Sequence, residues 1–146
     1  MVNKKLVKLD IGCGKNKREG FIGIDIDPNS DADVIASALN LPFKDNSVDE
    51  IYSSHLVEHF SPKEAEKFFA EIYRVLKKGS RAFLKIDTDW TKKRLLQKDP
   101  THKHRYSVRE IKKILRQFNF SQSKVKRKIY LINFHLRNKI FVELVK

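Results

Sequence analysis

The sequence predicts an α/β fold built on a largely parallel sheet. Short apolar runs that end at turn residues alternate with segments of helical spacing, a pattern typical of α/β layer folds. The chain has 146 residues, 40% of them hydrophobic, which is enough for one domain with its own core. Its single cysteine excludes an internal disulfide. We therefore expect a single domain over residues 1–146.

Four strands are expected in the N-terminal half of the chain. Each is a short apolar run that ends at glycine, proline or small polar residues. These strands span residues 5–11, 21–26, 33–38 and 48–54. Only six residues separate Gly14 from the second strand, so the helix between the first two strands must be reduced to a turn or less.

Two capping boxes predict the starts of helices. Ser61 and Glu64 have the Ser-x-x-Glu spacing in which each side chain bonds the other residue's backbone N–H, and Ser107 and Glu110 repeat it. Apolar residues at helical spacing follow both boxes. Gly79 is expected to end the first helix.

Three further strands are expected after the first helix. One covers residues 81–87. The tail then holds two apolar runs, which we expect to be joined near Arg137-Asn138. Such a C-terminal hairpin would add an antiparallel edge to the parallel sheet.

Charge is distributed unevenly along the chain. Residues 1–90 hold 14 Lys and Arg and 15 Asp and Glu, whereas residues 91–146 hold 17 Lys and Arg and 3 Asp and Glu. This asymmetry predicts an anionic partner, with nucleic acid first and an acidic membrane surface or an anionic small molecule behind it. The alternative is a solvated lysine-rich surface without a partner. Lysines gathered on one face would favour the first interpretation.

No targeting or membrane segment is expected. The N-terminal residues lack the apolar core of a signal peptide, and no apolar run approaches the ~20 residues that a membrane helix needs. Together with the single cysteine, these features predict a cytoplasmic protein that does not insert into membranes.

The stretch LDIGCGKNKREGFIGIDID places a glycine turn between acidic residues. Gly12 and Gly14 permit backbone conformations that a side chain would forbid, and they let a ligand approach closely. The dinucleotide fingerprint needs a third glycine where Lys17 stands, and the chain has no G-x-x-x-x-G-K-[ST] phosphate loop. Asp10 before the turn and Asp25 after it favour a ligand with positive charge and ribose hydroxyls over a pyrophosphate.

A series of motifs resembles one known family. The chain contains, in order, LDIGCG, GFIGIDIDP, LPFKDNSVDEIYSSHLVEHF and EIYRVLKKGS. Over residues 6–87 this series resembles the class I S-adenosylmethionine-dependent methyltransferases, and most of all their small type 11 branch. The resemblance implies a Rossmann-like, mostly parallel twisted sheet with helices on both faces. It also implies S-adenosylmethionine as the cofactor, whose amine, sulfonium and ribose diol suit the acids beside the turn.

The resemblance implies cofactor contacts at the matching positions. The methionine end of the cofactor would be lined by Asp10, Gly12, Cys13 and Gly14. The carboxylate of Asp25 would accept hydrogen bonds from the ribose hydroxyls. Cys13 is expected to be a small packing residue with no attacking role.

On the adenine side, Ile26 would pack on the ring. Families of this kind often carry an acid near the adenine amine, but Ser37 stands at the corresponding position. Adenine recognition would then fall on the backbone around Ala38 and Leu39. Ser54 would end the fourth strand beside the transferred methyl group.

His55 is the candidate general base, because methyl transfer to oxygen or nitrogen needs a proton removed and imidazole titrates near pH ~6.5. The alternative is that His55 only positions the cofactor or a loop. His55, Glu58 and His59 also spell H-x-x-E-H, the inverted zincin signature. The capped helix start at Ser61 argues against one continuous helix through this motif, so no metal site is expected. Glu58 and His59 are expected to cap or tie down the helix that follows.

The substrate side is expected in the basic half of the chain. Residues 1–87 would form the cofactor-binding half and residues 88–146 the substrate-side half. Trp90, His102 and His104 would flank the substrate, and Trp90 could stack on a base. The expected acceptor is RNA or another anionic molecule. The alternative is a non-catalytic methyltransferase-like module that binds S-adenosylmethionine and docks RNA or a partner protein.

Overall fold

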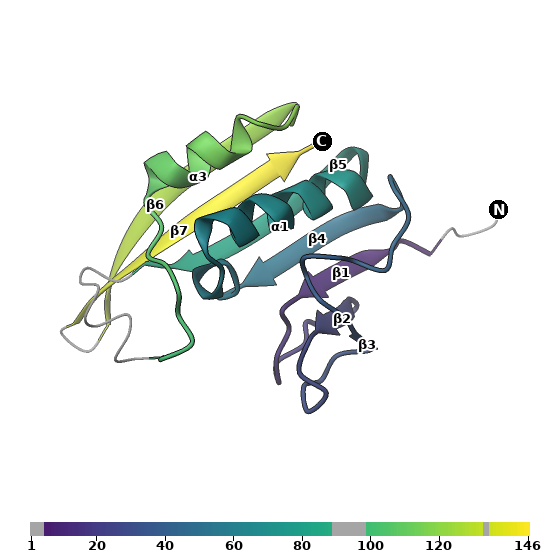
Figure 1. Ribbon diagram of the computed structural model, residues 1–146, viewed down its shortest axis with the longest axis horizontal. Helices are drawn as coiled ribbons and strands as arrows, with labels where there is room; N and C mark the ends of the chain where they lie inside the picture. Colours follow the sequence, from purple (N-terminus) through teal and green to yellow (C-terminus); the bar gives the residue numbers. More distant parts are fainter. Residues whose placement is uncertain (1–4, 89–98, 133–134) are drawn as a thin grey trace.

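The structure, a computed structural model, describes residues 5–88, 99–132 and 135–146. Its centre is a seven-stranded sheet with the strand order β3-β2-β1-β4-β5-β7-β6 (Figure 1). The strands are β1 (Lys8–Ile11), β2 (Ile22–Asp25), β3 (Val34–Ile35), β4 (Val48–Ser54), β5 (Leu76–Asp87), β6 (Gln122–Ile132) and β7 (His135–Val145). The helical elements are the 3₁₀ turn η1 (Val57–His59), α1 (Pro62–Val75) and α3 (Val108–Leu115).

The sheet combines parallel and antiparallel pairing as the sequence predicts. β1 pairs in parallel with β2 and β4, and β3 and β5 extend the parallel part on either side. β7 lies antiparallel between β5 and β6. Residues 12–21, which connect β1 to β2, form turns and contain no helix. The α/β fold class, the C-terminal antiparallel pair and the reduced first helix are therefore confirmed.

Both capping boxes are confirmed. At the start of α1, the Ser61 hydroxyl accepts from the Glu64 N–H at 3.4 Å, and the Glu64 carboxylate accepts from the Ser61 N–H at 2.8 Å. At the start of α3, the corresponding bonds between Ser107 and Glu110 measure 3.2 and 2.8 Å. Each box satisfies two N–H groups that have no partner within the helix.

Two boundaries differ from the predictions. α1 ends at Val75 and not at Gly79, because Leu76 is already extended and pairs with β4. Gly79 lies in the irregular first part of β5, where it adopts a φ of +77°. The C-terminal strands are not joined near Arg137-Asn138, since both residues lie inside β7 and pair with β6. The long pairing between these strands overrides the local polar sequence.

Both described helices cover the same face of the sheet (Figure 1). Beneath them, Ala82, Leu84 and Ile86 of β5 are buried together with Phe68 and Phe69 of α1. Full burial of a large apolar side chain contributes roughly 1.5–3 kcal/mol, so this layer holds the core. None of the described helices has the length and apolarity to cross a membrane.

The opposite face of the sheet, here called the open face, differs from the prediction of helices on both faces. The connections from β1 to β2, β2 to β3 and β3 to β4 are turns and loops, so they contribute no helix to either face. Alternation along the strands directs Phe83, which is 37% exposed, to the open face while its neighbours Ala82 and Leu84 face the core. In the described part of the chain, helices therefore lie on one face only.

Candidate functional site

The predicted site residues meet at one end of the sheet. β1 lies between β2 and β4, so the strand order reverses there. The crevice beyond the carboxyl ends of such strands is where open α/β sheets bind ligands. The glycine turn follows β1, Asp25 ends β2 and Ser54 ends β4. The structure thus brings residues from three strands to this reversal point.

The glycine turn folds back onto the end of β2. Gly12 and Gly14 adopt φ values of +73° and +55°, in the left-handed region that favours glycine. The Gly12 N–H donates to the carbonyl of Ile24 at 2.7 Å, and the Gly14 N–H donates to the Asp25 carboxylate at 2.8 Å. A Cβ at Gly12 would lie 2.9 Å from Leu56 Cδ1, whereas one at Gly14 would meet no protein atom within 4 Å. A side chain at Gly12 would therefore have to displace Leu56, whereas one at Gly14 would enter open space.

Two acids and one thiol line the turn. Asp10 is buried, its carboxylate accepts from the Arg18 N–H at 2.8 Å, and burial raises its pKa. Burial, followed by the charges of Asp10 and Asp25, raises the pKa of the Cys13 thiol to about 11. The thiol is thus protonated near neutral pH, which fits the predicted packing role and gives no thiolate nucleophile.

Asp25 keeps the capacity to bind a ligand. One carboxylate oxygen accepts from Gly14 N–H and the other from Asp27 N–H at 3.0 Å. Each carboxylate oxygen has two lone pairs, so both can still accept a hydroxyl. Two carboxylates beside the turn, together with the free space at Gly14, fit a cofactor that carries a cationic end and a ribose diol.

The predicted adenine side is only partly built. Ile26 follows β2 and is 72% exposed, so a ligand can reach its side chain, and its contact with adenine stays a prediction. Ala38 and Leu39 are half-buried and pack against the core. The Leu39 N–H already donates to the Ser37 hydroxyl at 3.2 Å, so this donor has a partner within the loop.

His55 lies within a cluster of charged side chains after β4. It adopts a left-handed φ of +58°, which is uncommon for a residue other than glycine, and its N–H donates to the Lys85 carbonyl at 2.8 Å. Its Nδ1 lies 3.3 Å from Glu58 Oε1 and 3.8 Å from Asp87 Oδ2. Its Nε2 lies 3.1 Å from Lys139 Nζ. Backbone strain of this kind is found where a side chain must be held in one direction.

Glu58 orients the imidazole from a fully buried position. Its side chain is 0% exposed, and its Oε1 also accepts from the Asp87 N–H at 3.2 Å. A carboxylate at Nδ1 favours the tautomer with the proton on Nδ1, which leaves Nε2 as the acceptor. The His55 side chain is 38% exposed, so its ring can reach a bound molecule.

Sequence reasoning missed the role of two residues in this cluster. Glu58 was expected to cap or tie down the following helix. Its carbonyl accepts instead from the N–H groups of Lys103 and His104, which links η1 to the loop before α3. Lys139 gave no local signal, because only the register between β5 and β7 places it opposite Asp87.

The inverted zincin arrangement is absent from the H-x-x-E-H segment. The 3₁₀ turn η1 ends at His59, and α1 starts separately after the Ser61 cap. His55 and His59 lie in different clusters, and His59 Nδ1 bonds the Thr101 hydroxyl at 2.8 Å. Two groups of described side chains have ligand atoms within 4.8 Å of one another, namely His55–Glu58–Asp87 and His59–Asp99–His102. Both contain hydrogen bonds within the protein, and the absence of a metal stays a prediction.

The residues predicted on the substrate side are held by protein contacts. His102 is 7% exposed and packs edge-on against the His59 ring, with a centroid distance of 4.7 Å. His104 Nε2 lies 2.9 Å from the Glu110 carboxylate, and so it supports the capping box of α3. Trp90 lies outside the described residues. The two histidines thus fix the loop before α3, and their role toward a substrate stays a prediction.

The fold is shared with solved methyltransferase structures. The chain is similar to an S-adenosylmethionine-dependent methyltransferase from Archaeoglobus fulgidus, with 21% identity, a TM-score of 0.77, and coverage of 98% of this chain and 87% of that one. It is also similar to phosphoethanolamine N-methyltransferase 2 of Haemonchus contortus in complex with S-adenosylmethionine, at 16% identity and a TM-score of 0.78. That match covers 100% of this chain and 50% of the Haemonchus protein.

A third similar structure comes from the complex between the Haloferax volcanii Trm112 methyltransferase activator and its methyltransferase. Its identity is 16%, its TM-score is 0.68, and the match covers 99% of this chain and 84% of that one. Comparison with curated proteins gave no match.

A family model described as a methyltransferase domain matches residues 9–84, more than half of the chain. The matched segment runs from β1 into β5 and contains the glycine turn, Asp25 and His55. It therefore covers the ends of β1, β2 and β4, whereas Asp87 at the end of β5 lies beyond it. The chain belongs to this methyltransferase family, and S-adenosylmethionine is its cofactor.

Proposed function

We propose that the protein transfers the methyl group of S-adenosylmethionine to an anionic acceptor, and that RNA is the first candidate for this acceptor. The observation that carries this proposal is the arrangement at the strand reversal. A glycine turn between two carboxylates ends β1, and a histidine oriented by a buried glutamate follows the neighbouring strand β4. This arrangement joins a site for a cationic nucleoside to a group that can accept a proton.

The cofactor would be held by residues of three strand ends. Asp10, Gly12, Cys13 and Gly14 would line its methionine end, and Asp25 would accept from its ribose hydroxyls. Ile26, Ala38 and Leu39 would contact the adenine, and Ser54 would lie beside the methyl group. When bound, S-adenosylmethionine supplies a methyl group on a sulfonium sulfur that is open to in-line displacement. The protein would contribute mainly the positioning of the acceptor.

His55 would remove the proton of the acceptor's hydroxyl or amine through Nε2. Glu58 and Asp87 would stabilise the imidazolium that forms, because opposite charges nearby favour the protonated imidazole. In the structure Lys139 Nζ lies at Nε2, so the lysine must move aside or pass on its own proton before His55 can act. Residues 88–146 would supply the substrate side.

A second candidate is a non-catalytic module that binds S-adenosylmethionine and docks RNA or a partner protein. Occupation of His55 Nε2 by the Lys139 ammonium favours it, since a base in that state has no free lone pair. The similar Haloferax structure, a complex with an activator protein, gives a precedent for a partner. In either case we place the protein in the cytoplasm, where its single cysteine fits.

Calorimetry with S-adenosylhomocysteine tests the cofactor site. Asp25→Ala should weaken binding about 10- to 100-fold, since hydrogen bonds to a charged group contribute roughly 1.5–3 kcal/mol. Asp27→Ala is the matched control, because Asp27 is exposed and its carboxylate accepts from the backbone N–H and the side-chain amide of Asn29. If the native chain does not bind, or if both variants bind equally well, the site assignment is wrong.

Transfer of a labelled methyl group separates the two candidates. Label should enter the RNA fraction. His55→Asn should abolish transfer, while the variant should still bind S-adenosylhomocysteine. Asparagine tolerates the left-handed backbone of position 55, so the variant should fold. Binding without label in RNA, protein, lipid or small-molecule fractions would favour the non-catalytic module.

A further inference from the structure

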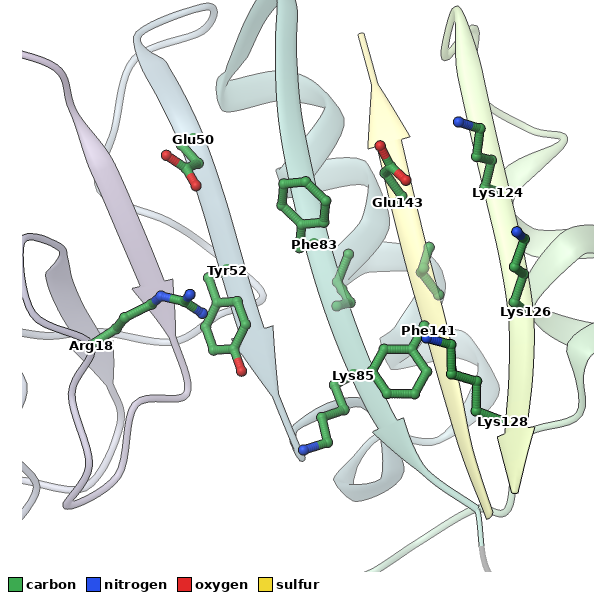
Figure 2. Close-up of a pocket in the computed structure, with 12 residues that line it drawn as sticks. Arg18, Glu50, Tyr52, Phe83, Lys85, Lys124, Lys126, Lys128, Phe141 and Glu143 are labelled. Atoms are coloured by element: carbon green, nitrogen blue, oxygen red, sulfur yellow. The ribbon is translucent and has the colours of Figure 1, made fainter. Parts of the chain in front are cut away.

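The open face of the sheet carries a depression of about 620 Å³ that is lined by aromatic and basic side chains (Figure 2). β4, β5 and β7 contribute the aromatic rings, and β6 contributes a row of lysines. These side chains are Tyr52, Phe83, Phe141, Lys124, Lys126 and Lys128. No described helix covers this face, so these side chains stand open here.

One row of residues across the sheet connects the lining of the depression to the end of β4. In the sheet register Ser54 is opposite Lys85, Lys85 is opposite Phe141, and Phe141 is opposite Lys126. Neighbouring strands lie about 4.8 Å apart, so this row spans roughly 14 Å from the end of β4 to the edge strand. A chain molecule that lies across the open face would therefore reach Ser54 directly.

The charge of the depression suits a polyanion. Its lining includes five cationic residues and two acids. One acid, Glu50, is already paired with Lys8 at 3.0 Å. Lys124, Lys126 and Lys128 are exposed and alternate along β6, so they project from one side at intervals of about 6.8 Å. The sequence left open whether the basic residues gather on one face, and these lysines do.

The aromatic rings add a feature that a merely solvated lysine surface lacks. Phe83 is 37% exposed in the middle of the depression. The Arg18 guanidinium lies 4.3 Å from the Tyr52 ring centroid, and Lys128 Nζ lies 5.1 Å from that of Phe141. Aromatic and guanidinium planes on an open sheet are what unpaired bases stack on, whereas a lipid headgroup or a double helix offers no exposed base face.

We infer that the open face binds single-stranded RNA, with its phosphates on the β6 lysines and a base on Phe83. The inference deepens the proposed function, on which it rests for the identity of the acceptor, and it names the surface that presents RNA to Ser54 and His55. It requires no movement of α1 or α3, since both lie on the other face.

Fluorescence anisotropy with the full chain and no cofactor tests this surface. The probe is a labelled RNA of about 12 nucleotides, within the ~4–16 that single-strand sites cover. Replacing Lys124, Lys126 and Lys128 by Gln should lower the slope of log K against log salt by about 2, since each phosphate contact contributes ~0.7. The same contacts predict about 100-fold weaker binding near 0.1 M salt.

Two further variants locate the interaction. Phe83→Ala should weaken binding roughly 5- to 100-fold with an unchanged salt slope, because stacking involves no counterion. The matched control replaces three exposed lysines of the helical face, Lys63, Lys67 and Lys112, by Gln. It removes the same charge and should keep most of the affinity.

Several results would overturn the inference. Equal losses for the two triple variants would place the interaction elsewhere, and equal affinity for a duplex of the same sequence would exclude base stacking. DNA of the same sequence, phosphatidylserine vesicles and sedimentation of the protein alone are measured in parallel. Preference for DNA or vesicles, or a dimer that dissociates when Phe83 is replaced, would assign the open face to another occupant. Because binding is read without cofactor, its failure is distinct from a failure of S-adenosylhomocysteine binding.

Discussion

Replacing the two glycines of one turn by alanine should have separable effects. Both have positive φ values, so alanine costs about 1–2 kcal/mol of conformational strain at either position. At Gly12 the added Cβ would also lie 2.9 Å from Leu56 Cδ1, and such overpacking costs roughly 1–3 kcal/mol more. We expect Gly12→Ala to lower the free energy of unfolding by about 2–5 kcal/mol and Gly14→Ala by about 1–2 kcal/mol.

Urea unfolding measures the loss of stability, and calorimetry with S-adenosylhomocysteine measures the loss of cofactor affinity. The Cβ of Gly14→Ala would enter space in which no protein atom lies within 4 Å, so cofactor affinity should fall far more than stability. Adding Leu56→Ala to Gly12→Ala should relieve the clash between the new Cβ and the leucine side chain. A double-mutant cycle would report this as a coupling of roughly 0.5–3 kcal/mol between the two positions. Equal destabilisation by the two single variants would refute the packing argument, and an unchanged affinity of Gly14→Ala would refute the placement of the cofactor.

Three further predictions concern stability. Hydrogen bonds from Ser61 hold the pKa of Glu64 down to about 2, below its ordinary pKa of 4.5. The cap should therefore stabilise the fold fully above pH 4.5, and this stability should be lost as the pH falls toward 2. In Glu64→Gln the urea concentration at the unfolding midpoint should depend less on pH in this range. An unchanged pH profile would contradict the role of the cap. Tyr106→Phe should cost about 1–3 kcal/mol in urea unfolding, because the buried hydroxyl donates to the Phe60 carbonyl at 2.7 Å; a neutral result would mean that water replaces it. Arg74→Lys should lower the thermal midpoint, since lysine cannot reproduce the guanidinium bonds at 2.7–3.0 Å to the neighbouring carboxylates and loop carbonyls. An unchanged midpoint would show that the remaining contacts suffice.

The parts of the fold that depend on short sequence spacing were predictable. Ser61 with Glu64 gave the start of α1, and the short interval after Gly14 gave the missing first helix. The end of α1 and the limits of β7 were not predictable in this way. They depend on pairing between strands that are distant in sequence, such as Leu76 with β4 and Asn138 with β6.

The site follows the same division. Asp10, the glycines and Asp25 lie within one motif, and their relative placement follows from the ends of adjacent parallel strands. The partners of His55 come from three other parts of the chain, and no local pattern marks Lys139 as one of them. The open face exists because no described helix covers it. Its exposure follows only from the three-dimensional placement of α1 and α3 on the same side of the sheet.

The position of β6 has a consequence for solubility. β6 is the outermost strand on one side of the sheet, while the other side ends in β3, which has only two residues. An outer strand presents unpaired backbone groups on which another chain can add a strand, and natural edges are often guarded by lysine. The lysines of β6 would thus repel a second copy at the same edge where they attract a polyanion. Variants that neutralise them should need lower protein concentrations to stay free of aggregates.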